Sequence, residues 1–295
     1  MAQTSNTSKI VKGLRERYFK SLPGKESLVQ IINETEVSEH VYNSNAIENS
    51  TLTLEETEKI LLQIELSRFV SEREIYEAKN LASVMGYIEN KAKSTELTKD
   101  LMLLLHKMLI GNINPDIAGR FRGATEWVRV GNYIAANPEE IISLLDEMLL
   151  TLKTNSDESI IKRIAQQHLT FEHIHPFCDG NGRIGRVLNN FVLLKEDYVS
   201  INIAFTNRAE YYDAFKAFDT SGDTAVMEVI VGRALTNSYH KRLAYLEGKK
   251  IITLNEYAKK STLSHSNLIN KAQRQTIPAF LEKGVWKIAS DFKAS

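Results

Sequence analysis

The chain has 295 residues, of which 43% are hydrophobic, so it is long enough to build a sizeable core and more than one domain. Its 37 basic and 37 acidic residues give a net charge of zero, which excludes a general electrostatic attraction to nucleic acid or anionic membrane. The single cysteine, Cys178, excludes an internal disulfide. No apolar signal segment or membrane-spanning run is present, and we expect a cytoplasmic protein without membrane contacts.

Residues 1–95 are predicted to form an N-terminal helical region with polar faces. One helix is expected from about Leu54 to Ser67, because Thr53 can cap it ahead of several glutamates. Upstream, Ser44 and Glu48 would lie one turn apart on a short helix at about residues 40–50. Both side chains would then point into the same pocket.

Residues 96–245 are predicted to form the main helical core, which begins where Thr98 can cap the apolar helix that follows. The segments Gly119–Arg122 and Trp127–Ile134 alternate as a β-hairpin with Gly131-Asn132 near its turn. This pair of strands is isolated in an otherwise helical sequence.

The run His175-Pro176-Phe177-Cys178-Asp179-Gly180-Asn181-Gly182-Arg183-Ile184-Gly185-Arg186 is predicted to be a loop between two helices, at about 157–174 and 183–196. A glycine turn at a helix N-terminus exposes unpaired N–H groups that bind anions. Arg183 and Arg186 project from one face of the first turn and can bind phosphate oxygens with planar forks. These features predict a site for a highly charged phosphate ligand.

Two further side chains of this loop indicate the chemistry. Asp179 is a hard oxygen ligand beside the phosphate cradle, where Mg²⁺ is usually held by one or two carboxylates and by substrate phosphates. His175 is the nearby group that titrates close to neutral pH, and it can take a proton from an attacking hydroxyl. The sequence therefore predicts nucleotide or phosphoryl transfer.

The run from His175 to Arg186 resembles the signature of the Fic family, His-Pro-Phe-x-Asp/Glu-Gly-Asn-Gly-Arg-x-x-Arg, at every fixed position. The resemblance implies an all-α core with a small β-hairpin flap and a nucleotidyltransferase activity. The enzyme would transfer AMP from ATP to a Ser, Thr or Tyr hydroxyl of a protein and release pyrophosphate. By resemblance, His175 would be the base, Asp179 would hold Mg²⁺, and Phe177 would anchor the loop. The phosphates would be bound by Gly180, Asn181, Gly182, Arg183 and Arg186.

Other segments extend the resemblance. The hairpin is similar to the Fic flap, which implies that Val128, Val130 and Tyr133 pair with the target by strand addition. In the segment RAEYYDAF, Arg208 is followed by two tyrosines, and Tyr211 or Tyr212 would line the adenine pocket. Helical packing is the alternative role for these aromatic residues.

The segment Ser44-Asn45-Ala46-Ile47-Glu48-Asn49 resembles the Ser/Thr-x-x-x-Glu-Gly/Asn inhibitory motif of self-restrained Fic proteins. By resemblance, Glu48 would pair with Arg186 and occupy the guanidinium meant for the γ-phosphate. ATP would then bind with its α-phosphate out of line for attack. The alternative is a helix that ends at Asn49 with Glu48 in solvent.

Residues 250–295 have the spacing of a helix-turn-helix followed by a two-stranded wing, and they resemble a winged helix. From Ile251 onward seven basic and three acidic residues give a local net charge of 7 − 3 = +4. This permits DNA binding through residues 251–295, whereas docking on the core or on a protein is the alternative.

Several alternatives stay open. The enzyme could use another donor nucleotide or remove AMP, or the chain could be a DNA-binding regulator or toxin-antitoxin-like component that modifies itself or a partner. A homodimer is also compatible with the sequence. His173 and His175 form an H-x-H pair without further zinc ligands at a familiar spacing. We expect His168 to bond to the backbone at the edge of the core and His106 to serve packing.

Overall fold

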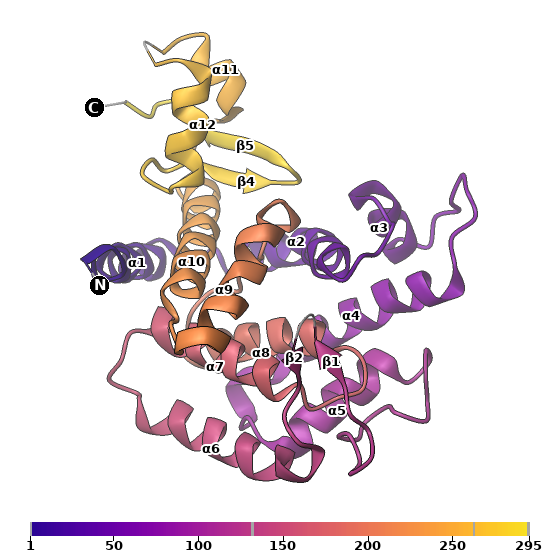
Figure 1. Ribbon diagram of the computed structural model, residues 1–295. Coiled ribbons are helices and arrows are strands. Elements are labelled where there is room, and N and C mark those ends of the chain that lie inside the picture. The colour runs from indigo at the N-terminus through magenta and orange to yellow at the C-terminus, as the bar shows by residue number, and fades with distance from the viewer. Residues whose placement is uncertain (1, 131–132, 262, 294–295) are drawn as a thin grey trace. The chain divides into compact units, whose positions relative to one another are not determined.

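The computed structural model describes residues 2–130, 133–261 and 263–293, so the predicted turn at Gly131-Asn132 lies outside the described residues. The chain is mostly helical with two small antiparallel sheets, which confirms the predicted fold class (Figure 1). It divides into two compact units, one of residues 37–198 and 203–228 and one of residues 1–36, 199–202 and 229–295. Among the described helices, none is both long and apolar enough to cross a membrane.

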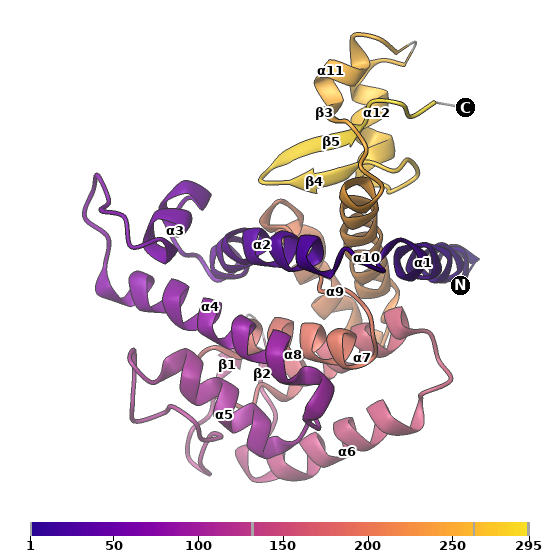
Figure 2. The same ribbon diagram turned by 180° about the vertical axis from the view of Figure 1, so that it is seen from behind.

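The first of these units is built around α7 (Ile160–Ile174) and α8 (Asn181–Lys195), which pack side by side and are buried on most of their surfaces (Figures 1 and 2). Helices α4 and α5 pack together beside α8, and α6 and α9 pack on α7. The other elements are the end of α2 (Glu26–Ile47), α3 (Leu54–Leu61), α4 (Glu72–Lys91), η1 (Ala92–Ser94), α5 (Lys99–Ile110), β1 (Arg129–Val130), β2 (Tyr133–Ile134), η2 (Pro138–Glu140), α6 (Ile141–Thr154), η3 (Phe205–Asn207), α9 (Arg208–Ser221) and the start of α10 (Ala225–Leu246).

Helix starts follow the predicted caps. The hydroxyl of Thr98 accepts from the backbone N–H of Leu101 at the start of α5, and Thr53 forms a reciprocal capping box with Glu56 at the start of α3. Helix α3 ends at Leu61, earlier than the expected Ser67. The reason is Gln63, which takes a left-handed conformation with φ of 59° and closes the helix end.

The predicted hairpin is shorter than its sequence pattern suggests. Strands β1 and β2 pair antiparallel with Arg129 opposite Ile134 and Val130 opposite Tyr133. The expectation of a strand over Gly119–Arg122 is wrong, because these residues form a turn and an irregular segment. Arg122 is instead buried, and its guanidinium donates to the carbonyl of Ile174 at the end of α7 and to that of His175, which follows it.

The other unit contains α1 (Ala2–Ser21), the start of α2, most of α10 and the C-terminal residues. The two helices expected here are present as α11 (Leu254–Ala258) and α12 (His265–Gln273), and the predicted strand pair as β4 (Phe280–Glu282) and β5 (Val285–Ala289). The resemblance to a winged helix stays a prediction. A further strand, β3 (Ile251–Thr253), was not predicted and pairs with β5 to give the order β3-β5-β4. The two compact units are defined by packing, whereas the predicted domains 1–95, 96–245 and 250–295 were defined by sequence motifs. The limits of these domains stay predictions.

Candidate active site

The loop from His175 to Gly180 joins α7 to α8 and is closed by one amide side chain. Asn181 Oδ1 accepts from the Phe177 N–H at 2.9 Å, and Asn181 Nδ2 donates to the Phe177 carbonyl at 2.8 Å. His175 and Gly180 are both left-handed, with φ of 51° and 81°, which reverses the chain at each end of the loop. The buried Asn181 side chain thus shapes the loop. The group of Asn181 that could bind a phosphate is its backbone N–H at the start of α8.

Phe177 is fully buried, as the anchoring role requires, and His106 stacks on its ring with centroids 3.8 Å apart. His106 Nδ1 accepts from the Gly119 N–H at 3.0 Å, so the proton lies on Nε2, which donates to the Asp179 carbonyl at 3.1 Å. Burial lowers the pKa of His106 to about 4 and keeps it neutral. The sequence indicated only packing for His106, because nothing in the spacing showed that it holds the backbone of a predicted metal ligand.

Asp179 and Arg183 belong to a charged cluster with two residues of α4. Arg73 Nη2 lies 2.6 Å from Asp179 Oδ2, and Arg183 lies 3.2 Å from Asp179 Oδ1 and 3.1 Å from Glu77 Oε1. Burial alone would raise the pKa of Asp179, but the Arg183 and Arg73 guanidiniums outweigh it and keep the carboxyl ionised. Arg73 and Glu77 were not predicted, because no spacing within the sequence links α4 to the loop.

A cavity of about 340 Å³ opens beside this cluster and is lined by residues of the Glu48–Thr51 segment, α4 and the loop. Its lining includes the ionised Asp179 and Arg183 and the backbone of Gly180. A carboxylate oxygen next to phosphate-binding groups is the donor set that Mg²⁺ prefers, so the residues present fit this ion. Asp179 would hold it, and the ion would supply neutralisation of phosphate charge.

Arg186 is buried and all its observed partners come from the predicted inhibitory segment and from α9. Its Nε donates to Ser44 Oγ at 2.9 Å, and its Nη2 donates to the Ser44 carbonyl and to Glu48 Oε1, both at 2.8 Å. Nη1 donates to the Tyr211 hydroxyl at 3.1 Å. The segment is not a short helix as expected, because Ser44 belongs to the last turn of the 22-residue α2 and Glu48 follows it directly.

The two tyrosines of α9 occupy different environments. Tyr211 is only 1% exposed, and its hydroxyl joins Arg186 to His168 Nε2, which lies 2.6 Å away. In this structure Tyr211 holds Arg186, and its role in an adenine pocket stays a prediction. His168 also interacts with the Gly185 backbone, so the Tyr211 hydroxyl is a partner in addition to the expected one. Tyr212 is 38% exposed, and the Arg208 guanidinium lies over its ring. Tyr212 is therefore the more accessible of the two tyrosines for contact with an adenine ring.

His175 lies at the C-terminal cap of α7, and Arg122 fixes its backbone by donating to its carbonyl at 2.8 Å. Burial lowers the pKa of His175 to about 4, so the imidazole is neutral and able to accept a proton. A hydrogen bond joins the flap to α7: the Tyr133 hydroxyl donates to the Glu172 carbonyl at 3.0 Å. Val128 and Val130 are half-buried on the flap, and the Val128 carbonyl accepts from the Ala135 N–H.

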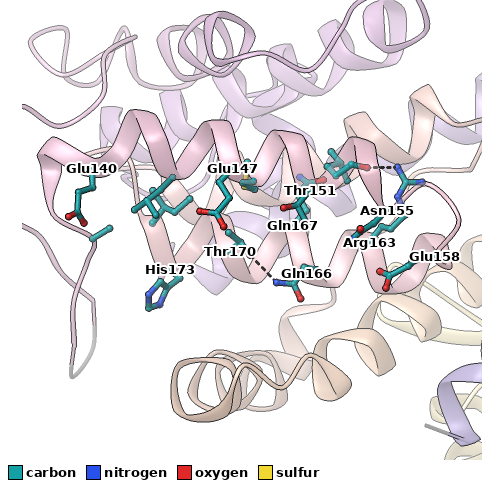
Figure 3. A pocket seen from close by; sticks show the side chains of 15 residues that line it. Glu140, Glu147, Thr151, Asn155, Glu158, Arg163, Gln166, Gln167, Thr170 and His173 are labelled. Carbon is teal, nitrogen blue, oxygen red and sulfur yellow. Dashed lines mark hydrogen bonds between the residues drawn. The ribbon is translucent and has the colours of Figure 1, made fainter.

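A second cavity, of about 430 Å³, lies between α6 and α7 and is lined by polar side chains of both helices (Figure 3). Glu140, Glu147 and Glu158 contribute negative charge to it, and its Arg163 is paired with Glu196. The cavity beside Asp179 also contains carboxylates, but it is lined by two guanidiniums, Arg73 and Arg183, and by the N-cap of α8 at Gly180, which the larger cavity lacks. The smaller cavity is therefore the better candidate for a triphosphate.

An imidazole, a carboxylate and two buried guanidiniums lie around a helix N-terminus in this helical domain, an arrangement suited to a phosphate ligand. Residues 96–193 match the Fic/DOC family model, and the chain therefore contains a Fic/DOC domain. The resemblance found in the loop from His175 to Arg186 is confirmed at this level.

Known relatives agree with this assignment. The chain is 29% identical over 232 residues to the protein adenylyltransferase Fic of Drosophila persimilis, with 73% of this chain and 45% of the relative aligned. The corresponding protein of Drosophila melanogaster gives the same identity and 46% coverage. The chain thus spans less than half the length of these relatives.

Solved structures resemble the fold. Fic-1 of Caenorhabditis elegans, residues 134–508 in its own numbering, superposes with a TM-score of 0.73 at 25% identity and covers 84% of this chain and 74% of that chain. A Fic domain containing signaling protein of Bacteroides thetaiotaomicron gives a TM-score of 0.72 at 24% identity, with 81% of this chain and 97% of that chain covered. The likeness therefore extends well beyond the matched Fic/DOC domain.

Proposed function

We propose that the protein is an adenylyltransferase that transfers AMP from ATP to a hydroxyl side chain of a protein. The observation that carries the proposal is the arrangement of a neutral, partly buried His175 beside a loop whose two arginines, Arg183 and Arg186, face carboxylates that a triphosphate would replace. The names of the relatives at 29% identity support the same activity.

In the proposed reaction His175 accepts the proton of the target hydroxyl as its oxygen attacks the α-phosphorus. The bond from the α-phosphorus to the leaving oxygen breaks, and pyrophosphate departs with the charge that Arg183 and Arg186 neutralise. A positioned base contributes ~10²–10⁴ in rate, and alignment and charge stabilisation supply much of the rest. The flap residues Val130 and Tyr133 would hold the target segment as an added strand.

Glu48 restrains this reaction in the proposal. Its carboxylate pairs with Arg186 Nη2 at 2.8 Å and so occupies the group that would bind the γ-phosphate. Ser44, Glu48 and Tyr211 engage four of the five N–H donors of Arg186, so ATP could bind this guanidinium in bidentate fashion only by displacing a partner. Misplacement of the α-phosphate then suppresses an in-line displacement.

The test is labelling with α-³²P-ATP and Mg²⁺ of wild-type, Glu48→Gly and Glu48→Gly/His175→Ala proteins, alone and with a cell lysate. Label on the protein or on a lysate band only in the Glu48→Gly lane supports AMP transfer with internal restraint. Label that appears equally in the double variant contradicts the role of His175. No label in any lane contradicts the proposal and favours another donor nucleotide or the removal of AMP.

A second candidate function is DNA binding by residues 251–293, and it is favoured by the distribution of charge. The three acidic residues there are engaged: Glu256 caps α11, Glu282 pairs with Lys241 and Lys287, and Asp291 pairs with Lys249. The exposed face of α12 is polar and ends at Arg274. Salt-dependent binding of duplex DNA by the full chain, lost in Lys271→Glu/Arg274→Glu, would support this function.

A further inference from the structure

Glu172 is a buried carboxylate on the last turn of α7 that none of the predicted roles uses. It is 8% exposed, and its Oε1 has no hydrogen-bond partner among the described residues. Its Oε2 lies 3.8 Å from Nδ1 of His175, a buried atom that has no hydrogen-bond partner of good geometry in the described part of the chain, and the Glu172 backbone carbonyl also interacts with this imidazole. Polar atoms left without hydrogen bonds inside a protein are costly, so both the unpaired Oε1 and the unpaired Nδ1 call for an explanation.

The position of Glu172 is fixed by close packing against α8. A Cβ atom at Gly185 would lie 2.4 Å from Glu172 Oε1, so only glycine leaves room for the carboxylate. One turn earlier on α8, the backbone of Gly182 lies against the carboxylate of Glu48, which follows α2. The two carboxylates therefore approach α8 on neighbouring turns.

We infer that Glu172 is a positioning residue that orients the His175 imidazole by accepting from Nδ1. We also infer that the negative charge of Glu48 opposes this orientation of the imidazole. This inference rests on the proposed function of His175 as the base. When Nδ1 carries a proton and donates it to the Glu172 carboxylate, Nε2 is left with its lone pair toward the target hydroxyl. After Nε2 has taken the hydroxyl proton, the carboxylate stabilises the imidazolium, and no proton passes to Glu172.

Charge links this pair to the inhibitory segment. Burial and, next, the Glu48 carboxylate raise the pKa of Glu172 to about 8, against the lowering effect of Arg186. A protonated Glu172 can donate to Nδ1 and so place the imidazole proton on Nε2, which is the wrong tautomer for a base. Removal of Glu48 lowers the pKa of Glu172 and favours the carboxylate. The groups that face Glu172 from the surrounding elements are Glu48 after α2, Tyr133 of β2, His168 of α7, His175 at its end, Arg186 of α8 and Tyr211 of α9.

The experiment is ¹⁵N-histidine NMR of the full chain as a function of pH, because nitrogen shifts report tautomer and protonation without a substrate. The proteins are wild-type, Glu48→Gly, Glu172→Gln and Glu48→Gly/Glu172→Gln, and a His175→Gln variant assigns the signal. Glu158→Gln is the control. Glu158 precedes α7, pairs with Lys162 and does not face His175. We expect the Nδ1–H tautomer and a raised His175 pKa in Glu48→Gly, both lost in the double variant.

Labelling with α-³²P-ATP in the Glu48→Gly background gives the second readout. Glu172→Gln should lower the rate about 10- to 100-fold and change the acidic limb of the pH profile, whereas Glu158→Gln should do neither. Identical His175 titrations with and without Glu172 would overturn the inference, even if AMP transfer occurs. A Glu172-dependent titration in a protein that transfers no AMP would support the pairing while the proposed function fails.

Discussion

The carboxylate of Glu48 lies against the backbone of Gly182 at the start of α8. A Cβ atom at position 182 would lie 2.2 Å from Glu48 Oε1 and 3.2 Å from Arg186 Nη1. The first turn of a helix is also where unpaired N–H groups attract phosphate. In the proposed mechanism the inhibitory carboxylate therefore competes with a nucleotide twice, for the Arg186 guanidinium and for the helix N-terminus.

Ser44→Ala should release Arg186 in part. The substitution removes the 2.9 Å bond from Arg186 Nε to Ser44 Oγ but leaves the bonds to the Ser44 carbonyl and to Glu48. Loss of one hydrogen bond to a charged group should raise AMP transfer about 3- to 10-fold, less than Glu48→Gly does. The rate is measured with α-³²P-ATP. Ser38→Ala is the control on the same helix, because Ser38 bonds to Glu58, and equal rates in both variants would contradict the prediction.

His106→Phe should weaken the loop without removing the ring that stacks on Phe177. The variant leaves the Asp179 carbonyl and the Gly119 N–H without the partner that each has in the wild-type protein. We expect a loss of about 2 kcal/mol in the free energy of unfolding at pH 7.5 and slower AMP transfer in the Glu48→Gly background. Urea unfolding measures the first effect, and an unchanged midpoint would show that His106 serves packing alone.

The effect of His106→Phe should also depend on pH. The folded-state pKa of His106 is about 4, below its usual 6.5, so the unfolded chain binds a proton first. The stability that neutral His106 contributes is present above pH 6.5 and is lost as the pH falls toward 4. The gap in unfolding free energy between wild-type and variant should therefore shrink between these values. A constant gap from pH 7.5 to pH 4.5 would contradict the assignment of a neutral His106.

Much of this site follows from short-range sequence. The run from His175 to Arg186 predicts the loop, because glycine, arginine and helix-start chemistry are all local there. The contact of Glu48 with Arg186, 138 residues further along the chain, was expected only from the resemblance to the inhibitory motif. The catalytic and inhibitory roles of these residues stay predictions until the labelling is done.

The supporting residues could not be predicted in the same way. His106 meets the Asp179 carbonyl across 73 residues, and Arg73 meets the Asp179 carboxylate across 106. Helical periodicity places such residues on an inward face but does not say which loop they meet. For Arg122 the alternation around it predicted a strand, but its guanidinium instead donates to the carbonyls of Ile174 and His175 at the end of α7.

Glu172→Gln should stabilise the fold at alkaline pH. The folded-state pKa of Glu172 is about 8, above its usual 4.5, so the folded protein holds a proton that the unfolded chain has released. This costs stability that grows as the pH rises from 4.5 to 8, and an uncharged amide avoids the cost. The variant should be more stable than wild-type by roughly 4 kcal/mol at pH 8 and equal to it near pH 4.5. Equal stability at both values would show that Glu172 is ionised without penalty.

Glu36→Gln should destabilise the unit that contains α10. The carboxylate of Glu36 lies 2.6 Å from Arg242 Nη2 and 3.2 Å from Lys241 Nζ, and all three side chains are at least nine-tenths buried. Loss of its charge leaves Arg242 as an uncompensated cation, which should cost about 3–5 kcal/mol in unfolding free energy. Lys241 keeps a second partner in Glu282, so Arg242 carries most of the effect.

Glu247→Gln is the matched control for this prediction, because its pair with Arg17 is partly exposed to solvent. A surface pair contributes about 0–1 kcal/mol, so the control should lie close to wild-type in urea unfolding. The double variant Glu36→Gln/Arg242→Met removes both buried charges and should recover most of the loss, since an apolar replacement for a buried pair is often tolerated. If Glu36→Gln and Glu247→Gln unfold at the same urea concentration, the buried cluster contributes no more than a surface ion pair.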